Sequence, residues 1–241
     1  MGCIMEYVNK DLCKKCGGYC CKKSGCDYGV DNFDIVTLNK VLEVLNSGKA
    51  SIVAALFFKT NSSGAEYISP FLYLRARNIN RDKVDLLSMK TTCSLLKSDG
   101  CSLTLEERPK GGVNLIPDSI ECYPLEDPFK IVDEWKKYQH ILAKAVIKLT
   151  GKSVNEKLSE DIENLVYDVQ IQHFDHVAVR ERIEILSLIK ELVRVCPEEC
   201  SRGLQRAKKD KLVITKRWFL KSSFILSLPY TFLIVLSLDL I

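Results

Sequence analysis

The stretch CKKCGGYCCKKSGC, residues 13–26, places five cysteines within fourteen positions. Three more cysteines follow at Cys93, Cys101 and Cys122. This density exceeds what a hydrophobic core needs, and the stretch has no amphipathic period long enough to fold alone. We therefore expect a bound metal to order it, because structural metal sites contribute folding free energy directly.

The predicted metal ligands are the eight cysteines of this split cluster, namely Cys13, Cys16, Cys20, Cys21, Cys26, Cys93, Cys101 and Cys122. The alternative is that a few of these thiols are small buried residues of the core. Cys20 and Cys21 are adjacent, and neighbouring side chains in extended backbone point to opposite sides. The pair therefore indicates two sites or one multinuclear site. Eight thiolates suit two zinc ions as well as an iron–sulfur centre, so both cofactors stay open.

The spacing differs from the commonest cysteine modules. A ferredoxin run needs a cysteine where Tyr19 stands, and the radical S-adenosylmethionine triplet needs one where Lys23 stands. A paired zinc ribbon needs a second two-residue spacing, and only residues 13–16 have one. The ligand set therefore belongs to a less common type of site.

Composition indicates the compartment and excludes one class of partner. Residues 1–11 have no apolar h-region and no small-residue cleavage site, and the eleven cysteines are an odd number. Both features favour the cytoplasm, where reduced and clustered thiolates hold zinc or iron. The formal net charge of +4 is small and dispersed, so we expect no nucleic-acid partner.

The remaining pattern predicts an α+β fold that is mainly helical. Residues 34–45 have helical spacing, with Asp31 or Asn32 as the N-cap and Gly48 beyond the end. Later segments predict a helix over 131–149 that stops at Gly151, and two helices within 154–195. An apolar run and a Tyr/Leu alternation predict a short hairpin. Its strands are residues 51–58 and 67–74, and its turn is residues 61–64.

The second group of cysteines has two local features. Residues 98–100 form a turn signal that would bring Cys93 and Cys101 together. Nearby, Arg108 precedes Pro109, and a fixed guanidinium there could offset the negative charge of a four-thiolate site. The alternative is a surface arginine before a loop proline, and the residues themselves do not decide between the two.

Together these motifs resemble the YkgJ-type cysteine-cluster family, over roughly residues 10 to 127. The resemblance rests on the residue 13–21 run and on the later landmarks Cys93-Ser-Leu-Leu, Gly100-Cys101-Ser-Leu, Glu107-Arg108-Pro109 and Cys122. That family is described as a zinc- or iron-chelating domain with eight characteristic cysteines, and it includes relatives of flagellin lysine-N-methylase. The resemblance implies metal chelation by the eight cysteines. This chain departs from it at Gly111-Gly112, where many relatives have a cysteine.

A second group of potential ligands lies outside the resemblance. His173 and His176 are spaced to share a helix face, and Cys196 and Cys200 follow. The alternative is that the cysteines pack in the core and the histidines lie on the surface, because such spacings arise by chance in helices.

The C-terminal part combines a basic stretch, 202–221, with an uncharged one, 224–238. The uncharged stretch is short for a membrane span and is interrupted by Pro229. A membrane-associated tail over 222–241 is therefore considered but not favoured over a buried or irregular terminal segment.

The sequence thus predicts a cysteine-cluster metal-binding domain over 1–127, a helical region over 128–200, and a basic stretch and apolar tail over 201–241. We expect a metal-binding protein with a structural or redox role and an unidentified protein partner or substrate. The alternative, implied only by the resemblance, is a protein lysine N-methyltransferase with unknown catalytic residues. A glycine-rich nucleotide loop is not visible, and the three histidines do not suggest a hydrolytic base.

Overall fold

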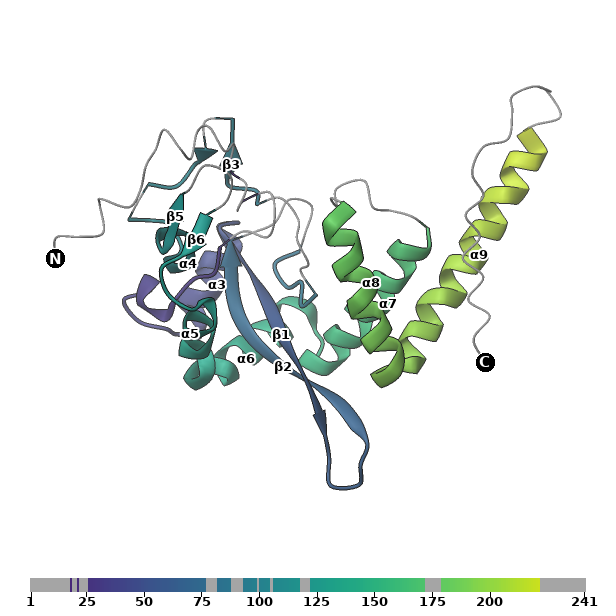
Figure 1. The fold of residues 1–241 in the computed structure, drawn as a ribbon, viewed down its shortest axis with the longest axis horizontal. Coiled ribbons are helices and arrows are strands. Elements are labelled where there is room, and N and C mark those ends of the chain that lie inside the picture. The colour runs from purple at the N-terminus through teal and green to yellow at the C-terminus, as the bar shows by residue number, and fades with distance from the viewer. Residues whose placement is uncertain are drawn as a thin grey trace.

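The computed structural model describes residues 18, 21, 26–76, 82–87, 93–98, 100–104, 106–117, 122–171 and 179–221. The first elements are short helices and antiparallel strand pairs: η2 (Val30–Asn32), α3 (Leu38–Asn46), β1 (Ala50–Thr60), β2 (Glu66–Ala76), β3 (Leu96–Lys97), β4 (Gly100–Cys101), α4 (Lys110–Val113), β5 (Leu115–Pro117) and β6 (Cys122–Pro124). The later elements are helices: α5 (Pro128–Asp133), η3 (Glu134–Tyr138), α6 (Gln139–Thr150), α7 (Val154–Gln170), α8 (Val179–Val195) and α9 (Pro197–Lys221). The predicted α+β class, mainly helical with a hairpin, is confirmed (Figure 1).

The hairpin of β1 and β2 is the longest strand pair. Its register runs from Ala50 opposite Ala76 to Thr60 opposite Glu66, and its far end extends away from the body of the molecule (Figure 1). The Asn61 carboxamide oxygen accepts hydrogen bonds from the amides of Ser63 and Ala65, which closes the turn. The predicted hairpin is therefore confirmed, and both strands are longer than the sequence suggested.

Both edges of the hairpin are covered at its base. On the β2 edge, the Tyr28 amide donates to the Leu74 carbonyl and the Ala76 amide donates to the Cys26 carbonyl. On the β1 edge, the Ile52 amide donates to the Lys83 carbonyl at 2.8 Å. These bonds fix the Cys26–Tyr28 segment beside β2, which places Cys26 at the base of the sheet.

The helix predicted over 34–45 begins later than expected. It begins at Leu38, where the Thr37 hydroxyl accepts a hydrogen bond from the Lys40 amide. The prediction of Asp31 or Asn32 as the cap was wrong, because residues 30–32 form η2 and the Asn32 carboxamide binds the amides of Gly29 and Lys110 instead. The C-terminal stop is confirmed, since Gly48 has a left-handed φ of 77°.

The segment predicted as one helix over 131–149 is divided into α5, η3 and α6, and it ends as predicted at a left-handed Gly151. Trp135 in η3 is fully buried, and its indole N–H donates to the Tyr28 carbonyl at 2.7 Å. Gln139 binds both the amide and the carbonyl of Leu72 on β2. One hydrophobic core therefore continues across residue 127, the boundary suggested by the sequence, while the division into domains remains a prediction.

Helices α7 and α8 confirm the two helices predicted within 154–195. Ser153 and Glu156 form a capping box at the start of α7. Helix α9 packs along α7, and a Cβ placed on Gly203 would lie 2.5 Å from the Glu163 carbonyl oxygen. The predicted tail, 222–241, lies outside the described residues. Among the described helices, none has both the length and the apolar character needed to cross a bilayer.

Candidate functional site

The predicted ligands are described unevenly. Cys13, Cys16 and Cys20 lie outside the described residues. For Cys122 only the backbone is described, and it belongs to β6. The side chains of four predicted ligands are described: Cys21 and Cys93 are buried, whereas Cys26 and Cys101 are half-buried. The structure therefore bears directly on half of the predicted set.

The charges of three of these four cysteines act on one aromatic side chain, Tyr28. Tyr28 is 5% exposed, and its hydroxyl donates to the Lys49 carbonyl at 3.4 Å. Burial raises the pKa of Tyr28 above its ordinary value, and the negative charges of Cys93, Cys101 and Cys26 raise it further. Such coupling requires charges to be near one another. Cys26, Cys93 and Cys101 therefore lie near enough to the Tyr28 phenol for their charges to affect its ionisation.

A backbone hydrogen bond joins Cys21 of the first cysteine group to Cys93 of the second. The Cys93 amide donates to the Cys21 carbonyl at 2.6 Å. Strands β3 and β4 pair with Leu96 opposite Cys101, which confirms the reversal predicted from the turn signal at 98–100. The Leu95 amide also lies 3.4 Å from the Cys93 sulfur and donates to it. An amide donor of this kind favours the thiolate form of a cysteine.

Gly111 and Gly112 allow α4 to lie close to the Cys26 segment. The Gly111 amide donates to the Asp27 carbonyl at 2.9 Å, and a Cβ on Gly111 would lie 3.0 Å from that same oxygen. A Cβ on Gly112 would lie 3.2 Å from the Cys26 sulfur. The position where this chain departs from the resembled family is thus in contact with a predicted ligand.

One cation whose charge interacts with a described cysteine was not singled out by the sequence. The Arg75 guanidinium pairs with Asp27, with 2.6 Å between Nε and Oδ1, and also donates to the Tyr73 hydroxyl. The Cys26 charge contributes to raising the pKa of Arg75, although burial alone would lower it. No sequence signal points to Arg75, because its position beside Cys26 depends on the pairing of β2 with residues 26–28.

Arg108 was predicted to offset the charge of a thiolate site, and its described contacts are to other groups. The Arg108 carbonyl accepts from the Asn32 carboxamide, and within the described part of the chain its buried Nε has no hydrogen-bond partner. A buried donor without a partner is costly. The surface alternative therefore fits Arg108 poorly, since the guanidinium is partly withdrawn from water.

The second group of potential ligands has different surroundings. Cys200 is 2% exposed and belongs to the hydrophobic core. Burial raises the pKa of its thiol to about 11, with smaller contributions from the charges of Cys196 and Glu199. Burial and the Glu199 charge also raise the pKa of Cys196. Both thiols are therefore protonated at neutral pH, which fits core packing. His173 and His176 lie outside the described residues.

Within the described ranges, no group of three or more His, Cys, Asp or Glu side chains is arranged to hold a metal ion. Cys13, Cys16, Cys20 and the Cys122 side chain are not among the described groups. Comparison with protein-family profiles, curated proteins and solved structures gives no match. The resemblance to the YkgJ-type family therefore stays a prediction.

Proposed function

We propose that this chain binds zinc or an iron–sulfur centre through its split cysteine cluster, and that the bound metal has a structural or redox role. The observation that supports it most is the backbone hydrogen bond from Cys93 to Cys21, which joins cysteines of the two groups, and the charges of Cys26, Cys93 and Cys101 all act on Tyr28. Cys21 and Cys93 also belong to the hydrophobic core, so metal content rather than burial distinguishes ligands from small core side chains.

The described residues have part of the chemistry that a thiolate site needs. Four thiolates around a divalent ion carry an excess of negative charge, which hydrogen bonds and nearby cations reduce. The Leu95 amide donates to the Cys93 sulfur, and the Arg75 charge lies near Cys26. In the proposal, Cys21, Cys26, Cys93 and Cys101 bind the metal together with Cys13, Cys16, Cys20 and Cys122. The metal would supply Lewis acidity or electron storage, according to its identity.

The test is purification under anaerobic conditions, followed by elemental analysis and a visible absorption spectrum. We expect either zinc without colour or iron with a brown charge-transfer band. The informative variant is Cys93→Ser, and the matched control is Cys196→Ser, because both replace one thiol but only Cys93 belongs to the split cluster and is bonded to Cys21 through its backbone. Metal content should fall in the first variant and remain at the wild-type level in the second.

Two results would contradict the proposal. One is a folded wild-type protein that contains no metal after anaerobic purification. The other is equal metal content in the Cys93→Ser and Cys196→Ser variants. Circular dichroism of the helices, measured in parallel, shows whether a variant that lacks metal is still folded.

A further inference from the structure

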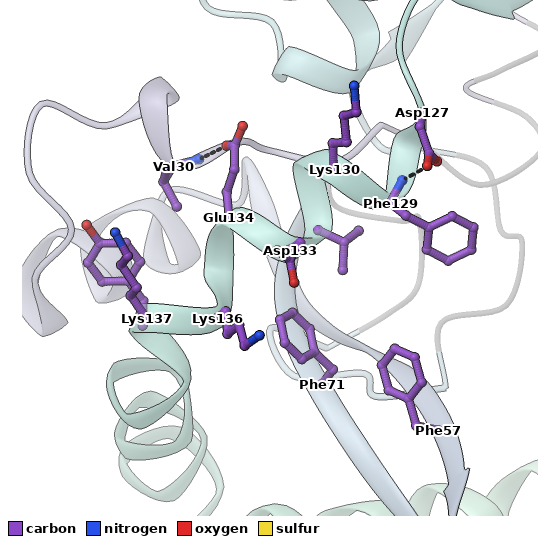
Figure 2. A pocket seen from close by; sticks show the side chains of 12 residues that line it. Val30, Phe57, Phe71, Asp127, Phe129, Lys130, Asp133, Glu134, Lys136 and Lys137 are labelled. Atoms are coloured by element: carbon purple, nitrogen blue, oxygen red, sulfur yellow. Dashed lines mark hydrogen bonds between the residues drawn. The ribbon is translucent and has the colours of Figure 1, made fainter.

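The part of the β1–β2 hairpin beyond Ala54 and Leu72, here called the arm, extends away from the body of the molecule (Figure 1). On one face of the arm, Phe57 and Phe71 pack edge to face, with 6.3 Å between their centroids, and line a groove of about 770 Å³ beside α5 and η3 (Figure 2). Phe58 lies on the opposite face, because successive side chains of a strand alternate. Phe57 is 46% exposed and Phe58 is 37% exposed, so the arm presents apolar surface on both faces.

The outer edge of β2 is covered at the start of the arm. In an antiparallel pair, every second residue directs its amide and carbonyl away from the neighbouring strand. Leu72 is such a residue, and the Gln139 carboxamide accepts from its amide at 2.9 Å and donates to its carbonyl at 2.7 Å. The next outward-facing residue toward the tip is Pro70, which has no amide N–H. A proline at this position hinders the addition of a further strand to the β2 edge.

The outer edge of β1 is covered at its base and uncovered along the arm. The Ile52 and Ala54 amides donate to the carbonyls of Lys83 and Leu86. The next outward-facing residues toward the tip are Leu56, Phe58 and Thr60. Over the ranges that the structure describes, the outward amides and carbonyls of these three residues make no hydrogen bond, and β1 contains no proline. Such an edge is a template for pairing with another strand.

We propose that a second copy of this chain pairs with the uncovered edge, β1 against β1 and antiparallel, about a two-fold axis at Phe58. Phe58 is the middle one of the three outward-facing residues, so this register uses all of them. Phe58 lies opposite the partner's Phe58, and Leu56 lies opposite the partner's Thr60. Three such pairs form about six backbone hydrogen bonds, two for each pair. The proposal does not depend on metal binding.

The side chains fit this register. On one face, Phe58 lies between Ile68 of its own chain and the partner's Phe58, which gives a continuous apolar row across four strands. On the other face, Lys59 is the single charged residue of β1, and it lies opposite the partner's Phe57, where its ammonium can contact the ring. The antiparallel arrangement also places the bodies of the two copies at opposite ends of the joined sheet. The edge is thus complementary to itself, as a two-fold interface requires.

The two neighbouring registers are less favourable. An axis at Lys59 places the ammonium groups of the two copies directly opposite each other, and like charges in that position destabilise a strand pair. An axis at Phe57 sets the partner's Thr60 against Ala54, whose amide already donates to Leu86. These constraints select the axis at Phe58.

The test is sedimentation velocity of the full chain in the presence of a reductant, which excludes disulfide-linked dimers. The interface is small, so we expect a monomer at about 1 µM and a dimer that becomes populated toward about 500 µM. A wild-type chain that is monomeric over this whole range would overturn the proposal.

Charge variants at the two-fold axis test the register. Phe58→Lys and Phe58→Glu should each weaken association by about tenfold or more, because each places like charges opposite one another. A mixture of the two variants should form a heterodimer, because opposite charges then meet at the axis. Phe129→Lys is the matched control, since Phe129 is 70% exposed on α5 and lies outside the arm. It should associate like the wild type.

Two further results would overturn the proposal. One is association of the Phe58→Lys and Phe58→Glu variants that equals that of the wild type. The other is a mixture of these variants that stays monomeric, because it would show that the two Phe58 positions do not meet. Circular dichroism shows that each variant is folded, which is expected because the Phe58 and Phe129 side chains are substantially exposed.

Discussion

The cysteine-bearing region and the C-terminal helices differ in the length of their secondary-structure elements. Strands β3 to β6 contain two or three residues each, whereas α7, α8 and α9 contain 17, 17 and 25 residues. An isolated short strand pair is marginally stable in water. Long amphipathic helices gain stability by burying one face, as Leu158, Ile162 and Val166 do on α7. The difference indicates that packing can stabilise the helices, whereas the short strands need an additional stabilising interaction.

The two regions nevertheless share a core through η3 and α6. Trp135 packs against Phe33 at 5.7 Å between ring centroids and binds the Tyr28 carbonyl, and Gln139 binds Leu72. The cysteines around Tyr28 are thus positioned partly by residues of the helical part. A change at this junction should affect both regions, whereas a change at the cysteines or at α9 should affect mainly one.

The largest effect is expected from Cys21→Ser. If metal orders the cysteine-bearing region, this variant should unfold it, because metal-binding free energy of roughly 10 kcal/mol or more can stabilise such short loops. Hydrogen exchange at the Cys93 amide, which binds the Cys21 carbonyl, measures the effect. Amides of α7 and α9 should stay protected, and Cys3→Ser should match the wild type. Unchanged protection of Cys93 in the Cys21→Ser variant would mean that packing alone holds this region.

The junction itself is tested by Trp135→Ala. Removing a fully buried indole should lower the free energy of unfolding by about 3–5 kcal/mol, through the lost transfer free energy and the cavity left behind. Phe129→Ala is the control, since that ring is 70% exposed and its loss should change stability by about 0.5 kcal/mol or less. Denaturant unfolding measures both. A small loss for Trp135→Ala would show that the two regions are less dependent on each other than their shared core suggests.

A smaller effect confined to the helices is expected from Gly203→Ala. Helix propensity alone would favour alanine by about 1 kcal/mol, but the new Cβ would lie 2.5 Å from the Glu163 carbonyl oxygen. We therefore expect a net loss of about 1–3 kcal/mol from forced separation of α7 and α9. Ser201→Ala, at an exposed position of α9, should be neutral or slightly stabilising. Thermal unfolding of both variants gives the sign, and stabilisation by Gly203→Ala would contradict the close packing.

The smallest effect concerns the pH dependence of the helical region. The pKa of Cys200 is raised to about 11 by burial, so in the interval between its ordinary value of 9.0 and about 11 the folded thiol keeps a proton that the unfolded thiol loses. Stability should therefore decrease as the pH rises through this interval. In the Cys200→Ala variant the decrease should be shallower by about 1 kcal/mol per pH unit within this interval. Urea unfolding at a series of pH values compares the slopes, and parallel slopes would show that Cys200 does not contribute.

The sequence predicted those elements that depend on local pattern. The hairpin followed from a Tyr/Leu alternation and a turn rich in Asn, Ser and Gly, and the end of α6 followed from Gly151. The start of α3 was missed because the side chain of Asn32, a good capping residue, binds the amides of Gly29 and Lys110. A cap competes with tertiary contacts that are not visible along the chain.

The sequence by itself determined the residue types available for function: a dense set of thiols, and turns that bring some of them together. Only the tertiary structure joined Cys21 to Cys93, brought Arg75 beside Asp27 and Cys26, and formed the groove between the hairpin and α5. The physical reason is the distance along the sequence between the residues that interact. Turns and helices are decided by neighbouring residues, whereas these sites depend on strand register and helix packing between residues that are tens of positions apart.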